Sequence, residues 1–534
     1  MSRRWHPFYP ENVPYEIELP VVSIYKLLED SAGKYPEYKA VIDGDEELTY
    51  AQLKYASDSF AAALFHRGFK KGDRIAVMLP NCKEYIIAYY AVHRLGGIVV
   101  QTNPMYQSYE LDYILRDSES KWMVSRKEQQ KKVHDIGLAD QLTMIAADGA
   151  IEQMDSLYHW IKEGRDQLPP LDNQPKEDIA VLQYTGGTTG QPKGAMLTHF
   201  NLVSNLYQNF ASYAGIYEQS HEVVLGVAPV FHAMGMTNMN MTIFTGSTYI
   251  AMDRFEINKL LHLIRKHKVT NFGGSPTMYI ALLRHPDLQA DDLDSLKICS
   301  CGSAPMPVEV INEFERRSRA RIIEAYGLTE ATTAVSRNPM KGLRKLGSIG
   351  IPIPNTDVKV VDIGTGTTEL PEGEPGELIV KGPQVMKGYW KKTEETKLAI
   401  RNGWLYTGDI ATMDENGYLY IVGRIKDMII AGGYNIYPAE IEEVLYKHPA
   451  ISEAVVYGVP DSYRGETVKA SIVLKQQMNA TEEEVMSWCQ ERLAKYKYPR
   501  LIEIRDALPK SAVGKILRRV LVEQAKEKLR LSNK

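Results

Sequence analysis

The segment from Tyr184 to Gly194 holds the densest set of chemically useful residues in this sequence, reading Tyr-Thr-Gly-Gly-Thr-Thr-Gly-Gln-Pro-Lys-Gly. Its four glycines let the backbone approach a ligand closely and expose N–H groups that no side chain obstructs. Its three threonine hydroxyls can bond phosphate oxygens or a metal ion, and Lys193 adds a positive charge. This composition predicts a loop that holds a polyphosphate, with a flexible glycine turn as the alternative.

The segment is not the usual P-loop. In that motif, glycine stands directly before the lysine, and serine or threonine stands directly after it. Here Pro192 precedes Lys193 and Gly194 follows it. Short apolar runs at 179–183 and 195–197 flank the segment, so we expect a strand on each side of the loop rather than a strand and a helix.

Three further turns combine glycine with a hydroxyl or an acid. They are residues 302–304 (Gly-Ser-Ala), 326–330 (Tyr-Gly-Leu-Thr-Glu) and 406–409 (Tyr-Thr-Gly-Asp). Each alone is equally typical of a structural turn. In open α/β sheets, ligands bind at the carboxyl ends of the strands. The occurrence of these turns together with the glycine-rich segment therefore favours a ligand site.

The elements that must position these turns follow from hydrophobic periodicity. Predicted helices and strands alternate before the glycine-rich segment and again over 257–324, which is typical of parallel, doubly wound sheets. Residues 347–388 are rich in Gly, Pro, Val and Ile, which favours a small antiparallel barrel or sheet. We predict a multi-domain α/β fold with a large N-terminal domain, 1–423. It would hold two parallel α/β sublobes of flavodoxin-like size and a small β-barrel near 345–423, and a small α+β C-terminal domain, 428–534, would follow.

Length, charge and cysteine content exclude several classes of protein. A chain of 534 residues is too long for one core, and a formal net charge of -4 gives no general attraction to nucleic acid. The four cysteines, at positions 82, 299, 301 and 489, lack metal-binding spacing, so we expect free buried thiols in a reducing compartment. The first twenty residues lack the apolar stretch of a signal peptide. We therefore expect a cytoplasmic protein.

One uncharged stretch, Val223 to Met252, is long enough to span a membrane. It contains Pro229, His232 and Asn238 among other polar residues and glycines, which would leave polar groups in hydrocarbon. We expect a buried strand, a helix and a second strand instead. At the end of the chain, residues 505–534 carry nine Lys or Arg and three Asp or Glu, which indicates either a solvated terminal helix or a phosphate-facing surface.

Taken in order, the motifs resemble the signatures of the adenylate-forming superfamily, which includes acyl-CoA synthetases, aryl-CoA ligases, luciferases and peptide-synthetase adenylation domains. The resemblance runs from about residue 20 to residue 530 and is strongest to bacterial long-chain fatty-acid–CoA ligases. The segments that carry it are 184–194, 326–330, 406–409, 423–427 (Gly-Arg-Ile-Lys-Asp) and 509–515 (Pro-Lys-Ser-Ala-Val-Gly-Lys), with 376–390, 431–438 and 459–464 for the long-chain branch.

The resemblance implies an ATP-dependent fatty acid–CoA ligase for medium- to long-chain acids. The carboxylate attacks the α-phosphorus of ATP to give acyl-AMP and pyrophosphate, and the thiol of coenzyme A then displaces AMP. Such an enzyme uses ATP, Mg²⁺ and coenzyme A; peripheral membrane contact and a homodimer stay open. The alternatives are a coumarate- or benzoate-like aryl-acid CoA ligase, and a carrier-loading or regulatory protein of the same fold.

The resemblance also assigns the nucleotide site. Lys193 and the N–H groups of the glycine-rich loop would hold the β- and γ-phosphates, and Thr188 with Glu330 would hold Mg²⁺. Glu330 has an alternative role as the N-terminal acid of a helix that starts at Ala331. Tyr326 would stack on adenine, or serve as a core aromatic. The ATP- and AMP-binding set is Thr185, Gly186, Gly187, Thr188, Thr189, Gly190, Lys193, Gly302, Ser303, Ala304, Glu324, Ala325, Tyr326, Gly327, Thr329, Asp409, Arg424 and Lys515.

Three charged residues complete the predicted adenylation chemistry. Asp409 would accept hydrogen bonds from the ribose hydroxyls, and Arg424 would add a second contact to the ribose or a phosphate. Lys515 would touch both the incoming carboxylate and the α-phosphate, so that a shared cation draws two anions together. Without its motif, Lys515 would be expected to be a solvated surface lysine.

The C-terminal domain would be mobile. The hinge would be 424–427, with Lys426 as the residue about which the domain turns between the two reactions. Lys515 would then leave the site, and Gly432, Gly433 and Tyr434 would enter it to line the coenzyme A channel.

His232 resembles the residue at the mouth of the acyl pocket, with a satisfied core histidine as the alternative. Met234, Gly235 and Met236 would line the pocket, because methionine suits adaptable apolar cavities, although it also fills plain cores. No acid stands near His232 to pair with an α-ammonium group, which argues against amino-acid activation. No tryptophan lies between residues 231 and 242, so the aromatic gate of some long-chain relatives cannot be placed and the chain length stays open.

Overall fold

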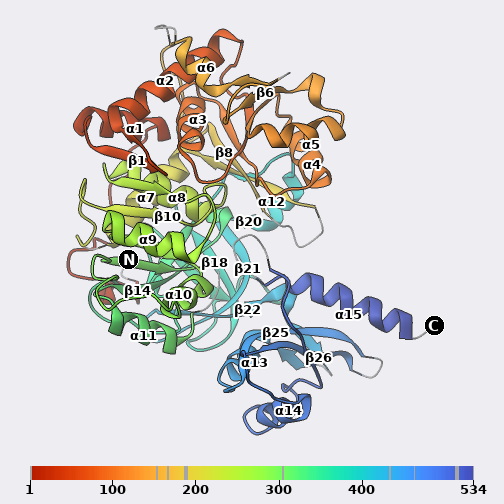
Figure 1. Ribbon diagram of the computed structural model, residues 1–534. Coiled ribbons are helices and arrows are strands. Elements are labelled where there is room, and N and C mark those ends of the chain that lie inside the picture. The colour runs from red at the N-terminus through yellow and green to blue at the C-terminus, as the bar shows by residue number, and fades with distance from the viewer. Residues whose placement is uncertain are drawn as a thin grey trace. The chain divides into compact units, whose positions relative to one another are not determined.

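The computed structural model of the chain describes residues 3–151, 154–164, 168–185, 191–213, 215–302, 306–431, 434–461, 464–510 and 516–532. The chain divides into two compact units (Figure 1). The first unit comprises Met1–Val358, Val380–Tyr406 and Asn416–Tyr418, and the second comprises Lys359–Ile379, Thr407–Glu415 and Leu419–Lys534.

One sheet of the first unit carries the glycine-rich segment. Its strands are β3 (Arg74–Met78), β4 (Ile98–Gln101), β5 (Trp122–Ser125), β6 (Thr143–Ala146), β7 (Asp155–Ser156), β8 (Ile179–Thr185), β9 (Lys193–Thr198) and β19 (Gly388–Tyr389). The spatial order is β19-β9-β8-β4-β3-β5-β6-β7. Pairing is parallel from β8 to β7 and antiparallel between β8, β9 and β19. The accompanying helices are α2 (Tyr50–His66), α3 (Lys83–Arg94), α4 (Ser108–Ser118), α5 (Gln130–Asp135), α6 (Leu157–Lys162) and α12 (Thr393–Ala399).

A second sheet of the first unit has nine strands. They are β1 (Lys39–Asp43), β2 (Glu46–Thr49), β10 (Val223–Gly226), β11 (Thr248–Ala251), β12 (Asn271–Gly274), β13 (Ile298–Cys301), β14 (Arg321–Gly327), β15 (Ala334–Arg337) and β16 (Ile351–Pro352). The order is β16-β15-β14-β13-β12-β10-β11-β1-β2, with antiparallel pairing only at the two ends of the described sheet. The helices are α1 (Ile24–Lys34), α7 (His199–Ser212), α8 (Ala233–Phe244), α9 (Ile257–His267), α10 (Pro276–Leu283) and α11 (Val308–Arg317).

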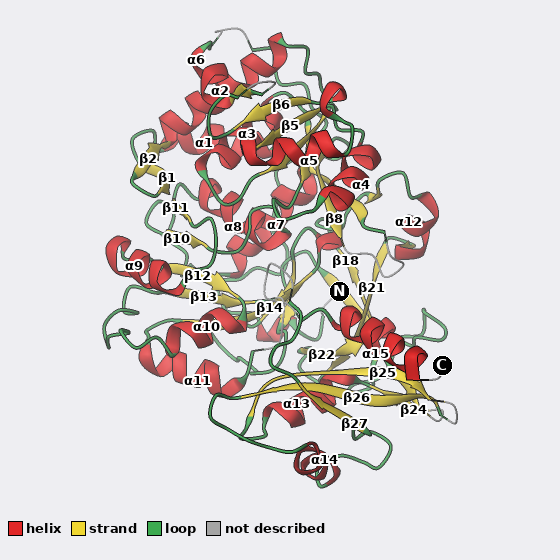
Figure 2. Cartoon of the chain, turned by 45° about the vertical axis from the view of Figure 1, so that its right-hand side comes forward, coloured by secondary structure: helices red, strands yellow, loops and turns green. Residues whose placement is uncertain are grey.

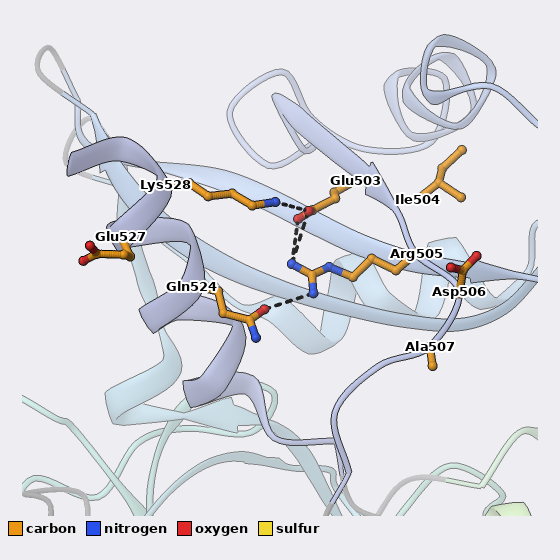
Figure 3. A pocket seen from close by; sticks show the side chains of 8 residues that line it. All are labelled: Glu503, Ile504, Arg505, Asp506, Ala507, Gln524, Glu527 and Lys528. Atoms are coloured by element: carbon orange, nitrogen blue, oxygen red, sulfur yellow. Dashed lines mark hydrogen bonds and ion pairs between the residues drawn. The ribbon is translucent and has the colours of Figure 1, made fainter. Parts of the chain in front are cut away.

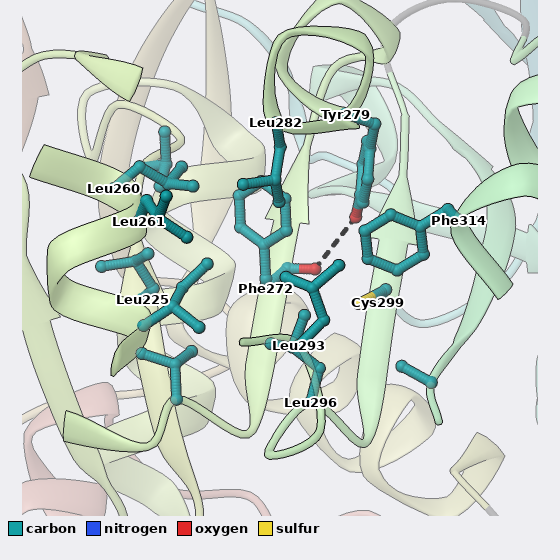
Figure 4. Packing of buried hydrophobic residues seen from close by; sticks show 14 of the residues in the cluster. Leu225, Leu260, Leu261, Phe272, Tyr279, Leu282, Leu293, Leu296, Cys299 and Phe314 are labelled. Carbon is teal, nitrogen blue, oxygen red and sulfur yellow. Dashed lines mark hydrogen bonds between the residues drawn. The ribbon is translucent and has the colours of Figure 1, made fainter. Parts of the chain in front are cut away.

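A buried apolar cluster fixes the central strands of this second sheet (Figure 4). Phe272 of β12 and Phe314 of α11 both pack against the ring of Tyr279, which lies in α10. The Tyr279 hydroxyl donates to the carbonyl oxygens of Phe272 at 3.1 Å and Ser300 at 2.8 Å. Because the hydroxyl of this buried ring bonds the backbones of both β12 and β13, it fixes these neighbouring strands, whose ends lead to the candidate site.

Two smaller sheets complete the fold (Figure 2). One has the order β17-β18-β21-β20, with β22 paired to β21; the other, in the second unit, has the order β24-β23-β26-β25, with β27 paired to β26. Their elements are β17 (Asp357–Val361), β18 (Gly376–Lys381), β20 (Ile400–Arg401), β21 (Trp404–Met413), β22 (Leu419–Arg424), β23 (Ile429–Ala431), β24 (Tyr434–Ile436), β25 (Ile451–Asp461), β26 (Gly465–Leu474) and β27 (Leu501–Ile504), with α13 (Pro438–Tyr446), α14 (Glu482–Gln490) and α15 (Arg518–Ser532).

The structure confirms several sequence predictions. Strands β8 and β9 flank the glycine-rich segment, and the uncharged stretch 223–252 forms β10, α8 and β11. All four cysteines are free and buried. Within the described part of the chain, no helix has both the length and the apolar character needed to cross a bilayer. The pairing of β1 and β2 with the second sheet was not predicted.

Candidate active site

Strands β8 and β9 form an antiparallel hairpin around the glycine-rich segment. Its register pairs Tyr184 with Gly194 and Thr185 with Lys193. Two of the predicted phosphate-binding side chains therefore stand directly opposite each other on neighbouring strands. The other predicted residues of this segment lie outside the described residues: Gly186, Gly187, Thr188, Thr189 and Gly190.

Glu330 reaches this hairpin from a 3₁₀ turn, η4 (Thr329–Ala331). Its Oε1 atom accepts hydrogen bonds from the hydroxyl of Tyr389 at 2.8 Å and from the hydroxyl of Thr185 at 3.5 Å. Neither of these bonds uses the Oε2 atom. The alternative role of Glu330 at the start of a helix is wrong, because η4 spans three residues and strand β15 follows it.

Tyr389 is the residue of this cluster that the sequence analysis missed. It lies in β19 opposite Ala195 of β9. Its ring centre is 5.3 Å from Lys193 Nζ, within the range of a cation–π contact. Burial, and next the carboxylate of Glu330, raise the pKa of Tyr389 well above its usual range, so the hydroxyl stays protonated and acts as a donor.

Helix α4 holds the outer side of the hairpin. The hydroxyl of Tyr184 donates to Asp117 Oδ2 at 2.6 Å, and the hydroxyl of Tyr113 donates to the carbonyl oxygen of Pro192 at 3.0 Å. The indole N–H of Trp390, the residue after β19, donates to the carbonyl oxygen of Asp117 at 3.0 Å. The C-terminal half of α4 thus bonds β8 through Tyr184 and the residue that precedes β9, Pro192.

The predicted adenine-binding residues lie at the ends of β13 and β14, which are neighbouring parallel strands. Gly302 directly follows β13, whereas Ser303 and Ala304 are outside the described residues. Glu324 of β14 accepts a hydrogen bond from the backbone N–H of Gly347 at 3.1 Å. Burial raises the pKa of Glu324 to about 7, against the opposing effects of this hydrogen bond and of Arg344.

The next residues of β14, Ala325, Tyr326 and Gly327, leave the buried part of the sheet. Tyr326 is half-buried. A Cβ atom on Gly327 would lie 1.5 Å from the carbonyl oxygen of Thr333, so only glycine fits there. The motif glycine therefore has a packing reason in this chain, besides any role near a ligand.

His232 stands at the N-terminus of α8. Its ring lies 5.0 Å from the ring of Phe231, and burial lowers the pKa of His232 to about 4, so the imidazole is neutral at neutral pH. Met234 lies near the adenine side of the site, because a Cβ atom on Gly302 would meet its sulfur at 3.8 Å. Met236 is buried and accepts a weak hydrogen bond from the amide of Gln101 at 3.2 Å.

Gly235 of the predicted acyl pocket is required by packing. A Cβ atom at this position would lie 2.1 Å from the carbonyl oxygen of Pro229. The first turn of α8 can therefore approach the preceding loop only with glycine here.

In the second unit, Asp409 and Arg424 are paired. They are opposite each other in the β21–β22 register, and Arg424 Nε lies 2.9 Å from Asp409 Oδ1. The Asp409 side chain is 7% exposed and that of Arg424 is 43% exposed. A nearly buried carboxylate thus faces a cation whose remaining surface is accessible.

Lys426, the predicted hinge residue, lies in the 3₁₀ turn η5 (Ile425–Asp427). Burial and the nearby Arg424 lower the pKa of Lys426, while Asp427 opposes this shift. The next residue, Asp427, is bonded by Arg518 at 2.7 Å, and Arg518 also bonds Glu442 at 2.7 Å. The guanidinium thereby joins the turn η5 to helices α13 and α15.

Tyr434, predicted to line the coenzyme A channel, is 56% exposed and stacks on Tyr496 with ring centres 4.5 Å apart. Gly432, Gly433 and Lys515, which belong to the same predictions, lie outside the described residues.

The basic end of the chain is largely ion-paired where it is described. Lys469, Arg505 and Lys528 all bond the carboxylate of Glu503, at 2.8, 3.1 and 2.8 Å. Glu503 lines a hollow of about 620 Å³ between β27 and α15 (Figure 3). Although burial opposes the shift, the bonds from these cations lower the pKa of Glu503 to about 2.

Comparison with known proteins decides the family. The profile described as "AMP-binding enzyme" matches residues 28–390, and the profile described as "AMP-binding enzyme C-terminal domain" matches residues 440–515. The chain belongs to the AMP-binding enzyme family. The matched regions contain the hairpin cluster, the β13–β14 strand ends and α8, and the resemblance inferred from the sequence motifs is confirmed.

Relatives of this AMP-binding enzyme include CoA ligases of more than one substrate class. The chain is 44% identical to a "Long-chain-fatty-acid--CoA ligase" of Bacillus subtilis (strain 168), covering 98% of this chain and 99% of the relative. It is 37% identical to a "Feruloyl-CoA synthase" of Amycolatopsis sp, covering 90% and 95%. Its fold matches the crystal structure of ATP-bound MatB from Rhodopseudomonas palustris with a TM-score of 0.88 and 32% identity, covering 95% of this chain and 99% of that one.

Proposed function

We propose that this chain is an AMP-forming fatty acid–CoA ligase that acts on medium- to long-chain acids. The observation that carries the proposal is a cluster beside the glycine-rich segment, in which Thr185 and Tyr389 both bond the carboxylate of Glu330 and Lys193 Nζ lies 5.3 Å from the centre of the Tyr389 ring. This cluster combines a cation, a hydroxyl and a carboxylate at the place where a polyphosphate would lie. The high identity to a long-chain-fatty-acid–CoA ligase over nearly the full length supports the choice of substrate class.

In the first reaction, the hairpin would hold the leaving pyrophosphate. Lys193 would offset charge on the β- and γ-phosphates, helped by Thr185 and the backbone N–H groups of the loop. Thr188 and Glu330 would hold Mg²⁺, which neutralises phosphate charge when bound. Glu330 suits this role because both of its side-chain hydrogen bonds to described residues end on Oε1, which would let Oε2 bind a cation.

The nucleoside would be held by residues at the ends of several strands. Tyr326 would stack on the adenine, near Gly302, Ser303, Ala304 and Glu324. Asp409 would accept from the ribose hydroxyls, because its buried carboxylate is already fixed by Arg424. Ala325, Gly327 and Thr329 would complete the backbone of this site.

The C-terminal domain would serve the two reactions in turn. Lys515 would draw the fatty carboxylate and the α-phosphate together, and it would leave after the domain turns about Lys426. Gly432, Gly433 and Tyr434 would then line the path of coenzyme A. The domain limits 1–423, 424–427 and 428–534 belong to this proposal.

The acyl chain would lie beside α8. His232, neutral because of its burial, would stand at the mouth of the pocket, next to Met234, Gly235 and Met236. No charged side chain would meet the chain there, since residues 223–252 contain none. We further propose a cytoplasmic enzyme that contacts the membrane surface peripherally to collect its substrate, and that forms a homodimer.

The test is nucleotide turnover across a panel of acids. The purified enzyme, with ATP and Mg²⁺, is given straight-chain acids from octanoate to octadecanoate, and also benzoate, coumarate and ferulate, with and without coenzyme A. We expect AMP release that depends on a straight-chain acid and is stimulated by coenzyme A, with acyl-CoA as product. AMP release that depends on aromatic acids alone would establish the aryl-acid ligase, which the similarity to a feruloyl-CoA synthase keeps as the second candidate.

A further inference from the structure

Tyr389 stands where three strands present side chains to one face of the sheet. Thr185 is opposite Lys193, and Tyr389 is opposite Ala195, two residues further along β9. Side chains two residues apart on a strand point to the same face, and residues opposite one another share that face. Thr185, Lys193 and Tyr389 therefore face the same side, with Tyr389 diagonal to Lys193.

The backbone of Tyr389 is fixed independently of its side chain. Its N–H donates to the hydroxyl of Thr396 at 2.8 Å, and the N–H of the following residue, Trp390, donates to the carbonyl oxygen of Gly194 at 2.8 Å. Glu330 is fixed in a similar way, since its carbonyl oxygen accepts from the N–H of Met386 at 2.8 Å. The Tyr389 side chain is thus carried on a strand whose backbone is held by hydrogen bonds, so it can orient the side chains that it contacts.

The Tyr389 side chain contacts two of the predicted phosphate-site residues, Glu330 through its hydroxyl and Lys193 through its ring face. Its hydroxyl donates to Glu330 Oε1 at 2.8 Å, and its ring face lies 5.3 Å from Lys193 Nζ. A hydrogen bond to a carboxylate directs the orientation of that group, and a ring face attracts a cation without fixing its donors. The two effects are separable by substitution, because phenylalanine keeps the ring and removes the hydroxyl.

We propose that Tyr389 is a positioning residue that sets Glu330 for the metal and Lys193 for the leaving pyrophosphate. The hydroxyl bonds Oε1 of Glu330, which would leave Oε2 to meet the cation, while the ring face holds Lys193 Nζ 5.3 Å from its centre. Thr185 makes only a 3.5 Å contact with the same oxygen, so the phenol supplies the shorter of the two bonds that orient the carboxylate. This inference rests on the proposed function.

The test compares Tyr389→Phe with Tyr389→Leu in the full-length enzyme. Mn²⁺ binding in the presence of a non-hydrolysable ATP analogue is followed by electron paramagnetic resonance, and pyrophosphate binding is followed by calorimetry. For Tyr389→Phe we expect Mn²⁺ affinity to fall about three- to tenfold with pyrophosphate affinity changed less than about twofold. For Tyr389→Leu, we expect both affinities to fall.

Two further variants make the result specific. Tyr25→Phe is the matched control, because the hydroxyl of Tyr25 also donates to a carboxylate, that of Asp58, at 2.6 Å, outside the hairpin cluster. Its Mn²⁺ and pyrophosphate affinities should equal those of the natural enzyme. Glu330→Gln tests the proposed function itself, which requires that this change weaken Mn²⁺ binding.

The outcomes are distinguishable. If Glu330→Gln weakens Mn²⁺ binding and Tyr389→Phe does not, the role of Tyr389 is overturned and the proposed function stands. If Tyr389→Phe and Tyr389→Leu lower both affinities and the thermal midpoint equally, Tyr389 is merely structural. If Glu330→Gln leaves Mn²⁺ binding intact, the assignment of Glu330 as a metal ligand is wrong, whatever the result for Tyr389.

Discussion

Single side chains at this site owe their roles to neighbours that the fold brings together. Glu330 and Lys193 share one phenol, that of Tyr389. Asp409 has its cation, Arg424, directly across a pair of strands. Such contacts orient charges before a substrate arrives, and prepositioned charge is the main source of rate enhancement in reactions that transfer charged groups.

Lys515→Ala should separate the two reactions. We expect the rate of acyl-AMP formation to fall at least about a hundredfold, because the two reacting anions lose their shared cation. The rate of thioester formation from supplied acyl-AMP should be nearly unchanged. Rapid-quench assays of each reaction measure this, and an equal loss in both would contradict the role of Lys515.

A pair of buried histidines predicts how stability depends on pH. His93 and His199 are fully buried with ring centres 5.3 Å apart, and burial lowers the pKa of His199 to about 4 and that of His93 well below its usual range. Folding therefore keeps both rings neutral, whereas in the unfolded chain both rings bind protons below the usual histidine pKa of 6.5. The contribution of this pair to the free energy of unfolding is fully present above pH 6.5. It is lost as the pH drops toward 4, by about 3 kcal/mol for His199 alone.

Urea unfolding at several pH values between about 7.5 and 4.5 measures this loss. His93→Phe keeps an aromatic ring and should reduce the pH-dependent part of the unfolding free energy. His262→Gln is the control, because His262 is exposed, and it should leave the pH profile unchanged. A profile that His93→Phe does not alter would show that other groups cause the loss.

Among the elements, the β8–β9 hairpin depends on α4. The sequence does not suggest this helix as part of a nucleotide site, yet its C-terminal half bonds β8, through Tyr184 to Asp117, and the residue before β9, through Tyr113 to Pro192. These bonds hold the hairpin at the two described ends of the glycine-rich segment, so loosening them should weaken the proposed phosphate binding.

Tyr184→Phe removes the bond to Asp117 and keeps the ring. We expect KM for ATP to rise about three- to tenfold, with KM for the fatty acid and for coenzyme A nearly unchanged. Asp112→Asn is the matched control, because Asp112 lies on the same helix but pairs with the exposed Arg116. Equal rises in all three KM values for Tyr184→Phe would indicate general loosening instead.

Much of this architecture is predictable from the sequence, and the exceptions have a common cause. Apolar runs beside the glycine-rich segment predict the hairpin, and the alternation of helices and strands predicts the parallel sheets, because both are local signals. Tyr389 and Asp117 could not be predicted. Each meets the hairpin through pairing or packing between distant parts of the chain, which leaves no periodic pattern in the sequence.

At the scale of the whole chain, the residues of the proposed site are far apart in the sequence. Thr185, Lys193 and Glu330 belong to the first unit, whereas Asp409 and Arg424 belong to the second. The glycine-rich segment would therefore be only half of a site, and its activity would depend on residues that lie hundreds of positions later. Domain rotation about Lys426 is the proposed way in which one chain serves both reactions.

Lys426→Pro should uncouple these reactions. Proline fixes φ near -65° and restricts the preceding residue, so the turn η5 would lose its freedom to rotate. We expect acyl-AMP formation to persist and thioester formation to fail. Lys426→Ala removes the charge but keeps the backbone free, so it should retain both reactions, and normal thioester turnover by the proline variant would exclude the hinge.

The central claim is that the enzyme cuts ATP between its α- and β-phosphates to activate a fatty acid. Phosphorus NMR of the products made from ATP, dodecanoate and coenzyme A tests it directly. We expect AMP and pyrophosphate in equal amounts, matched by dodecanoyl-CoA. ADP and inorganic phosphate as products, or nucleotide turnover that ignores the fatty acid, would contradict it.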